Sequence, residues 1–308
     1  LVEHVAGAKG GMELIGRGAM EAMLARLEAA PSSAPGGSAA NTTFALARLG
    51  QPAAFIGKLA DDELGKFYRA RFAELGGDTS RFKVSADGTT AQCLSLITPD
   101  SERTMRTDLA VAATLAPEEI TVSDFEGAGH VHVEGYLLFN RALAGAVLEK
   151  AKLAGCTVSL DLGSMEVVAA SRAELDALLR DHVDMVFANE DEASAFLGEP
   201  APERALAALA ELCELAVVKL GADGALLQHR DQHHRAEALR VSNVVDTTGA
   251  GDFWAAGFLY GFLRTGNLDA AARLGALLGA EVVQQVGADL DDAGWKRVEQ
   301  QSTQAVTA

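Results

Sequence analysis

The sequence predicts an α/β fold, a three-layer sandwich in which helices cover both faces of a mainly parallel central sheet. The first observation is a regular alternation of short apolar strands and helices from residue 129 onward. Strands buried on both faces are apolar along their length, and parallel neighbours need a crossover between them. The second observation is a group of period-2 stretches outside this alternation, which predict a small β lid.

The amino-terminal part of the chain is less regular. Apolar residues with helical spacing, from Met20 to Leu27, predict a helix that is broken at Pro31. A turn at Asp87-Gly88 separates two strand-like stretches. We expect helices at 17–30 and 61–75, a helix that ends at residue 49, strands at 9–15, 52–56, 81–85 and 89–98, and a polar segment at 99–107.

The carboxy-terminal part carries the alternation that predicts the sheet. Its expected strands are 129–134, 156–161, 183–188 and 215–220, and the helices between them are 140–154, 171–181, 191–197 and 203–213. A hairpin turn then leads into a strand at 225–228. We further expect a strand region at 235–245 and helices at 251–264, 268–285 and near 292–304.

Composition limits the function classes. The 308 residues are 49% hydrophobic and have a formal net charge of -17, which repels nucleic acid and anionic membranes, so we expect neither as a partner. The longest apolar run, 253–263, is too short to span a bilayer. Cys93, Cys156 and Cys213 are widely spaced, which indicates reduced thiols and a cytoplasmic location. The chain begins at Leu1 and shows no signal peptide.

The segment 244–252 is expected to form a short strand, a glycine turn and a helix start. The N–H groups of Gly249, Ala250, Gly251 and Asp252 can bind an anion together at that helix terminus. Such an anion hole beside a carboxylate suits phosphoryl transfer, because Asp252 can take the proton of an attacking hydroxyl group. The alternative interpretation is an aspartate that only interacts with the helix dipole.

Polar residues follow several of the predicted parallel strands. In open α/β sheets, ligands bind beyond the carboxyl ends of the strands. A single polar residue there would mean little, since caps and loops are often polar, but several together indicate one shared site. These residues are Glu134, Asp161, Asn189, Glu192, Lys219 and the segment 246–252.

Three more motifs have both a structural and a functional interpretation. Gly36 and Gly37 let a ligand approach the backbone, with Asn41 facing it, or they are small residues that allow close packing. The segment 189–192 either caps a helix or holds Mg²⁺ through water. The segment 219–224 is either an ordinary hairpin turn or a loop that places a cation and bare backbone against phosphate groups.

Two common nucleotide signatures are absent. The sequence has no P-loop, and Trp254 stands where a dinucleotide fingerprint needs its third glycine. Arg103 and Arg106 are the first clustered cations, although most such charges face solvent. The histidines of a polar turn region are interpreted as solvated and not as metal ligands: His229, His233 and His234.

Together, four motifs resemble the ribokinase (PfkB) family of sugar and nucleoside kinases. Residues 246–252 (Asp-Thr-Thr-Gly-Ala-Gly-Asp) are similar to its C-terminal signature, and residues 36–41 to its N-terminal signature. Residues 189–192 match its N-x-x-E motif, and 219–224 its nucleotide-loop pattern. Their order and spacing agree along nearly the whole chain. Within the family, residues 88–105 and 189–193 look most like bacterial adenosine-kinase-like members.

The resemblance implies a kinase that uses ATP and Mg²⁺ to phosphorylate an alcohol group of a small sugar or ribonucleoside. Asp252 would be the general base, and Gly249, Ala250 and Gly251 the anion hole. The implied substrate-binding residues are Gly36, Gly37, Asn41, Glu134 and Arg103. The implied nucleotide-binding residues are Asn189, Lys219, Gly221, Gly224, Val244, Thr247, Ala276, Gly279 and Ala280. Glu192 would hold Mg²⁺ through water, and the backbone of Asp246, Thr248 and Gly287 would hold a monovalent cation such as K⁺.

The resemblance also implies a division into a ribokinase-like core, residues 17–83 and 109–308, and a β lid, residues 1–16 and 84–108. Family members begin with a strand that ends in a substrate-binding aspartate. Here either that strand lies upstream of Leu1, or the sheet and substrate site are incomplete. The alternative function is a nucleotide- or sugar-binding regulator without turnover, and the intact Asp252 argues against it. The identity of the substrate and the formation of a homodimer are not determined by the sequence.

Overall fold

The central sheet of the computed structural model has six strands in the order β11-β10-β9-β8-β7-β6. β6 to β9 are parallel, whereas β10 and β11 are antiparallel to their neighbours. The structure describes residues 9, 11–98 and 103–307, and the predicted α/β class is confirmed. The strands are β6 (His130–Glu134), β7 (Thr157–Asp161), β8 (Met185–Asn189), β9 (Leu215–Lys219), β10 (Ala225–His229) and β11 (Gln232–Ala236).

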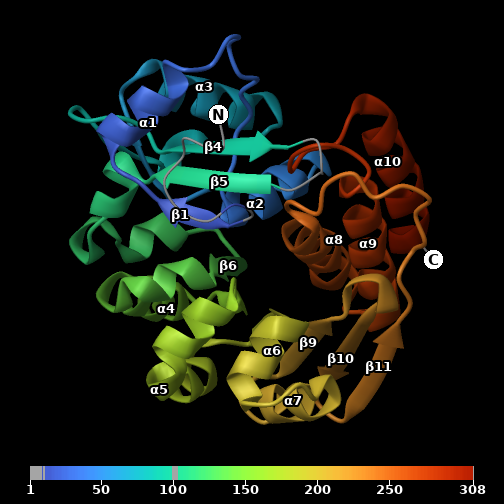
Figure 1. The fold of residues 1–308 in the computed structure, drawn as a ribbon. Coiled ribbons are helices and arrows are strands. Elements are labelled where there is room, and N and C mark those ends of the chain that lie inside the picture. The colour runs from blue at the N-terminus through green and yellow to red at the C-terminus, as the bar shows by residue number, and fades with distance from the viewer. Residues whose placement is uncertain (1–8, 10, 99–102, 308) are drawn as a thin grey trace.

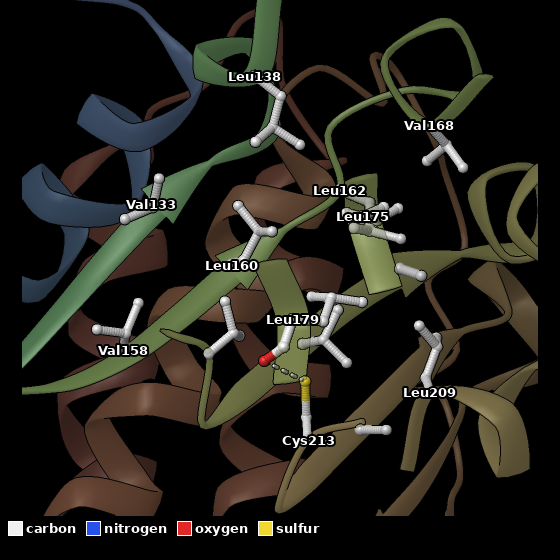
Figure 2. Packing of buried hydrophobic residues seen from close by; sticks show 14 of the residues in the cluster. Val133, Leu138, Val158, Leu160, Leu162, Val168, Leu175, Leu179, Leu209 and Cys213 are labelled. Atoms are coloured by element: carbon white, nitrogen blue, oxygen red, sulfur yellow. Dashed lines mark hydrogen bonds between the residues drawn. The ribbon is translucent and has the colours of Figure 1, made fainter. Parts of the chain in front are cut away.

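Alternate residues of the buried strands face opposite helical layers. In β8, Val186 and Ala188 belong to one apolar cluster, while Met185 and Phe187 belong to another. Figure 2 shows part of the first cluster, in which side chains from strands and helices interdigitate. That face is covered by α4 (Arg141–Leu153), α5 (Met165–His182), α6 (Glu190–Leu197) and α7 (Pro202–Ala210).

The second face is covered by α8 (Ala250–Thr265) and α9 (Leu268–Val282), against which α2 (Ser38–Arg48) and α10 (Asp292–Thr307) pack (Figure 1). A Cβ atom at Gly257 of α8 would lie 2.3 Å from the carbonyl oxygen of Leu274 in α9. Only glycine allows this approach, so α8 and α9 form a closely packed pair. Among the described helices, none combines the length and apolar content needed to cross a bilayer.

Two small sheets lie outside the central one. β1 (Met12–Leu14), β5 (Arg103–Asp108) and β4 (Gln92–Ile97) form a three-stranded sheet, in which β5 is central. β2 (Lys58–Ala60) and β3 (Lys83–Ser85) form a two-stranded parallel sheet. Both segments expected in the lid thus contribute to one sheet, but residues 84 and 85 pair with β2 instead. The division into core and lid stays a proposal, and residues 1–8, 10 and 99–102 lie outside the described ones.

Several predicted elements were wrong. Within 52–56 the structure has only an isolated bridge from Ala54 to Asp78. β11 ends at Ala236, so most of the strand expected at 235–245 is absent. The polar segment 99–107, for which no strand was predicted, overlaps β5 from residue 103, and the buried alternate positions of β5 are the polar Thr104, Arg106 and Asp108. An alternation carried by polar side chains does not stand out in a hydropathy pattern.

The remaining helices are α1 (Arg17–Leu24), which ends earlier than expected, and α3 (Glu63–Glu74). Short 3₁₀ helices occur at Thr79–Arg81, Ala110–Thr114, Pro117–Glu119, Val122–Phe125, Gly135–Phe139 and Gly221–Asp223.

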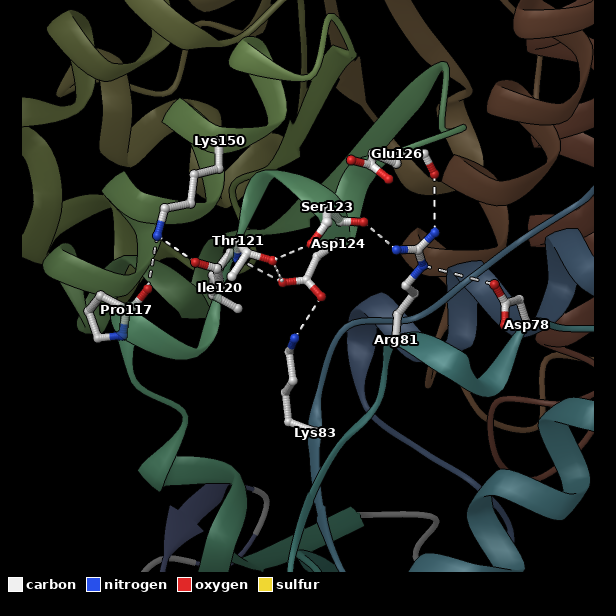
Figure 3. A network of polar contacts seen from close by, with 10 residues as sticks. All are labelled: Asp78, Arg81, Lys83, Pro117, Ile120, Thr121, Ser123, Asp124, Glu126 and Lys150. Atoms are coloured by element: carbon white, nitrogen blue, oxygen red, sulfur yellow. Dashed lines mark hydrogen bonds and ion pairs between the residues drawn. The ribbon is translucent and has the colours of Figure 1, made fainter.

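A polar network, shown in Figure 3, fixes the segment that leads into β6. Lys83 Nζ of β3 lies 2.6 Å from Asp124 Oδ1, and Arg81 donates to the carbonyl oxygens of Ser123 and Glu126. On the other side, Lys150 Nζ of α4 donates to the carbonyl oxygen of Ile120 at 2.5 Å. The network therefore ties the 3₁₀ segment to β3 and α4, and β6 follows it directly.

Candidate active site

The carboxyl ends of β6 to β9 bring four of the singled-out polar residues together. Glu134 pairs in register with Asp161, and Asn189 pairs with Lys219. Val133 and Val218 face the α4–α7 layer, so the side chains next to them in sequence, Glu134 and Lys219, face α8. The expected shared site at this sheet edge is therefore built from residues 85 positions apart in sequence.

The N-terminus of α8 lies at this edge. Gly249 is its N-cap and has φ +73, and a Cβ atom there would lie 2.6 Å from Ala288 Cβ, so both backbone and space require glycine. Within the described part of the chain, the N–H groups of Gly251 and Asp252 have no hydrogen-bond partner. These two donors and the helix dipole make the turn suitable for an anion.

Asp252 is held between α8 and α2. Its Oδ1 accepts from Ser38 Oγ at 2.8 Å, and its Oδ2 accepts from Asn41 Nδ2 at 2.7 Å. Thr42 Oγ1 donates to the Asp252 carbonyl oxygen at 3.1 Å. Burial raises the pKa of Asp252, and the hydrogen bonds from Asn41 and Ser38 oppose that shift. The carboxylate is therefore fixed in orientation and poised to accept a proton.

Ser38 and Thr42 were not predicted to have a role. A signal was nevertheless present, because residues three and four apart share one face of a helix. With Ser38 at the first position of α2, Asn41 and Thr42 lie on the same face. The helix that presents Asn41 to Asp252 thus presents two hydroxyl groups to the same residue.

Lys219 is the cation of the site. Its Nζ lies 2.5 Å from Asp161 Oδ2, and a Cβ atom at Gly251 would lie 3.2 Å from that same Nζ. Burial alone would lower the pKa of Lys219, but the carboxylates of Asp161, Glu192 and Asp252 outweigh burial and raise it. The ammonium group is therefore charged and lies directly beside the glycine turn.

Glu192 and Asn189 form a capping box at the start of α6. Asn189 Nδ2 donates to Glu192 Oε1 and Asn189 N to Oε2, both at 2.8 Å, and Glu192 N donates back to Asn189 Oδ1. Burial, with the nearby Asp161 carboxylate, raises the pKa of Glu192 to about 7. The capping interpretation accounts for both carboxylate oxygens, and the role toward Mg²⁺ stays a proposal.

Asp246 joins the segment before α8 to two other parts of the chain. Its Oδ1 accepts from Thr248 N at 2.9 Å, and its Oδ2 accepts from Gly287 N at 2.9 Å. Arg103 Nη1 of β5 lies 3.6 Å from Asp246 Oδ1. Burial would raise the pKa of Asp246, but these hydrogen bonds and the Arg103 charge outweigh it and lower the pKa. The three residues proposed around a monovalent cation are therefore neighbours, and Arg103 contacts them from the small sheet.

The remaining candidates differ in exposure and in local contacts. Val244 is 56% exposed, and the next residue is tied to the end of α9 by the bond from Val245 N to the Val283 carbonyl oxygen. Gly224 is explained by packing, because a Cβ there would lie 1.9 Å from the Ala236 carbonyl oxygen. The exposed ones are Gly36, Gly37, Gly221 and Thr247, the half-buried ones are Gly279 and Ala280, and Ala276 is buried.

A cavity of about 660 Å³ lies elsewhere, where β11 meets the turn after α8. Its lining includes His233, His234 and Asn267, and Gly266 is the C-cap of α8. Since a 16-residue helix is ~24 Å long, this cavity is far from the N-terminus of α8. No cluster of metal-ligating side chains occurs among the residues that the structure describes, these histidines included.

Comparisons with known proteins agree with this geometry. The family model of the pfkB family carbohydrate kinases matches residues 12–293. The chain is 33% identical to a solved adenosine kinase from Sinorhizobium meliloti, with a TM-score of 0.86 over 97% of this chain and 92% of that one. It is 32% identical to an ATP-dependent ribose-1-phosphate kinase from Halopiger xanaduensis, covering 82% of this chain and 81% of the relative. An aminoimidazole riboside kinase from Salmonella typhimurium is 31% identical over 77% of this chain and 76% of its own. The chain therefore belongs to the pfkB family of carbohydrate kinases and is an ATP-dependent sugar or nucleoside kinase.

Proposed function

We propose that the protein transfers the terminal phosphoryl group of ATP to an alcohol group of a ribonucleoside or a small ribose-like sugar. The observation that carries this proposal is the position of Asp252, whose carboxylate is oriented by Ser38 and Asn41 beside free N–H groups at the start of α8. Relatives named as adenosine, riboside and ribose-1-phosphate kinases support this choice of acceptor.

The residues present fit a nucleotide with Mg²⁺. Two partnerless N–H groups, a helix N-terminus and the ammonium group of Lys219 meet at one point, which offsets the net charge of -17 that otherwise repels an anion. When bound, Mg²⁺ neutralises negative charge on the phosphate groups. Glu192 and Asn189 would hold the ion through water, and the exposed Val244 with Ala276 and Ala280 would flank the base.

The chemistry of this chain's own residues follows from their contacts. Asp252 takes the proton of the acceptor hydroxyl, because Ser38 and Asn41 already satisfy its other lone pairs and fix its direction. Gly37, Asn41 and Glu134 would position the acceptor at the same edge. The small sheet with Arg103 would close over the site and exclude water, which otherwise competes as the acceptor.

Three finer points belong to the same proposal. A monovalent cation such as K⁺ would bind the carbonyl groups around Asp246 and Thr248, beside the loop at Gly287 that Asp246 already holds. The free thiols of Cys93, Cys156 and Cys213 suit a cytoplasmic enzyme. A homodimer stays a prediction, which sedimentation of the purified protein would test.

The test is an ATP-consumption assay with Mg²⁺ across a panel of sugars and nucleosides, repeated with and without K⁺. We expect ATP consumption to depend on a ribose-containing acceptor, with the phosphorylated product identified by mass spectrometry. A protein that binds ATP but consumes it with no acceptor on the panel would instead be a nucleotide-binding regulator.

A further inference from the structure

Four hydrogen-bonded polar side chains lie along one face of the sheet and lead toward the active-site carboxyl groups. It starts at the exposed Thr157, whose Oγ1 lies 2.8 Å from His130 Nδ1. His130 Nε2 lies 2.8 Å from Ser159 Oγ, and Ser159 Oγ lies 2.7 Å from His132 Nδ1. β6 supplies the two histidines and β7 the two hydroxyl residues, on the face covered by α8.

Once the proton of Thr157 is assigned, the other proton positions in this chain follow one bond at a time. Thr157 Oγ1 lies 3.1 Å from the Gly129 carbonyl oxygen, which can only accept, and with the hydroxyl proton in that bond Thr157 accepts from His130 Nδ1. Burial lowers the pKa of His130 to about 3 and that of His132 to about 4, so each neutral ring has one N–H group. His130 Nε2 is then an acceptor, and Ser159 donates to it.

The last step sets the tautomer of His132. Since the Ser159 proton is used, Ser159 Oγ accepts from His132 Nδ1, and His132 Nε2 is left as a bare lone pair. This nitrogen is buried and makes no hydrogen bond in the described part of the molecule. It lies 3.9 Å from Glu134 Oε1, and Glu134 Oε2 is also buried with no partner. An acceptor therefore faces a carboxyl group that needs a partner.

Among Glu134, Asp161 and Asp252, Glu134 has the fewest groups that would stabilise the negative charge of its carboxylate. Asp161 of β7 is paired with Lys219 of β9, and Asp252 of α8 receives two hydrogen bonds. Glu134 has no ion pair with a lysine or arginine among the described residues. The neighbouring charges that act on its pKa are Asp161, Asp252 and Lys219, and Tyr136 beside it is sensitive to its charge in turn. Burial, then Asp161 and Asp252, raises the pKa of Glu134 well above its ordinary value.

We propose that His132 is a positioning residue whose Nε2 lone pair accepts the proton of Glu134, holds that carboxyl group neutral and leaves Asp252 as the ionised base. A small rotation of the Glu134 side chain closes the 3.9 Å separation to a hydrogen bond. Ser38 contacts both acids, but its single proton is donated to Asp252, so the Glu134 proton is left for His132. Only the role of Asp252 as base rests on the proposed function; the tautomer and the proton on Glu134 do not.

Nuclear magnetic resonance of the whole protein tests this without any assay of turnover. With ¹⁵N-labelled histidine rings, assigned by loss of one signal in His132→Gln, we expect a neutral Nδ1–H tautomer for His132 between about pH 6 and 8. An Nε2–H tautomer or an imidazolium ring would overturn the proposal. The tautomer is measured on the resting protein, without substrate. An inactive preparation would therefore contradict the proposed function and not this inference.

A second measurement follows the ¹³C-labelled carboxyl group of Glu134, assigned with Glu134→Gln. Ser159→Ala releases His132 to adopt the Nε2–H tautomer, which donates to Glu134 and favours its charged form. We therefore expect the titration midpoint of Glu134 to fall in Ser159→Ala. Ser171→Ala is the matched control, since this buried hydroxyl donates only to the Val167 carbonyl oxygen in α5. Equal midpoints in wild type and Ser159→Ala would show that the histidine chain has only a structural role.

Discussion

The ammonium nitrogen of Lys219 lies 2.5 Å from Asp161 Oδ2, at the carboxyl ends of two strands that flank β8. Both side chains are largely buried, at 12% and 7% exposure. The same nitrogen would lie 3.2 Å from a Cβ atom at Gly251. One ion pair therefore lies between the sheet edge and the turn of α8 that we propose binds phosphate.

Removing one partner of this pair should destabilise the protein strongly. Lys219→Met leaves Asp161 buried without its cation, which costs about 3–5 kcal/mol of unfolding free energy. The double variant Lys219→Met/Asp161→Asn should recover most of the loss, because no uncompensated charge remains. Denaturant unfolding measures both values. Arg17→Met is the control, because Arg17 forms an exposed pair with Glu21, and it should lower the unfolding free energy by no more than about 1 kcal/mol. An equal loss of unfolding free energy in Lys219→Met and Arg17→Met would contradict this prediction.

The two glycine caps of α8 provide a matched comparison. Gly249 and Gly266 both have a left-handed conformation, with φ +73 and +65, but only Gly249 has a neighbour that a Cβ would strike. Alanine at either position should cost about 1–2 kcal/mol in backbone strain. Gly249→Ala should in addition lose turnover, because the 2.6 Å contact with Ala288 displaces the N-terminal turn. Kinetics beside thermal unfolding would separate the effects, and equal turnover in both variants would remove the turn from the mechanism.

Glu192 should make stability depend on pH. Its pKa is raised from 4.5 to about 7 in the folded protein, so ionisation is disfavoured there, and this group lowers the unfolding free energy as pH rises from 4.5 to about 7. Glu192→Gln should flatten that decline in denaturant titrations across this window. It should also raise the Mg²⁺ concentration needed for half-maximal turnover. A variant with unchanged metal dependence would leave Glu192 with its capping role alone.

The α/β core could be predicted because its strands are continuous apolar segments separated by helices. The same regularity predicted a candidate site, since parallel strands bring their carboxyl ends to one edge, where Glu134, Asp161 and Lys219 lie. The periodicity in those segments is local, and a single sequence contains it. This is why the sheet, and the edge at which the candidate residues meet, could be predicted from the residues alone.

Elements without an apolar pattern could not be predicted in the same way. β5 alternates through Thr104, Arg106 and Asp108, whose burial depends on partners in the folded chain. The bond from Ser38 to Asp252 joins residues 214 positions apart and depends on how α2 packs against α8. The histidine chain beside Glu134 likewise needs the register of β6 with β7 before its hydrogen bonds can be seen.

Asp252→Asn should lower turnover strongly in a folded protein. The amide keeps the size of the side chain and can still accept from Ser38 or Asn41, but it cannot take the proton of the acceptor hydroxyl. Loss of a general base typically costs roughly 10² to 10⁴ in rate. The N–H groups of Gly251 and residue 252 belong to the backbone and are unchanged, so ATP affinity should hold or tighten as one negative charge leaves the site.

Asp269→Asn is the matched control, because Asp269 has the same charge in the first turn of the neighbouring helix α9 and lies outside the site. If Asp252 interacts only with the helix dipole, both variants should lose at most about 1 kcal/mol of stability and keep their turnover. Turnover, nucleotide affinity and melting temperature should be measured on one preparation of each variant. From the geometry at Ser38 and Asn41 we expect Asp252→Asn to fold and bind ATP but lose turnover, while Asp269→Asn stays active. Near-normal turnover of Asp252→Asn would remove Asp252 from the mechanism.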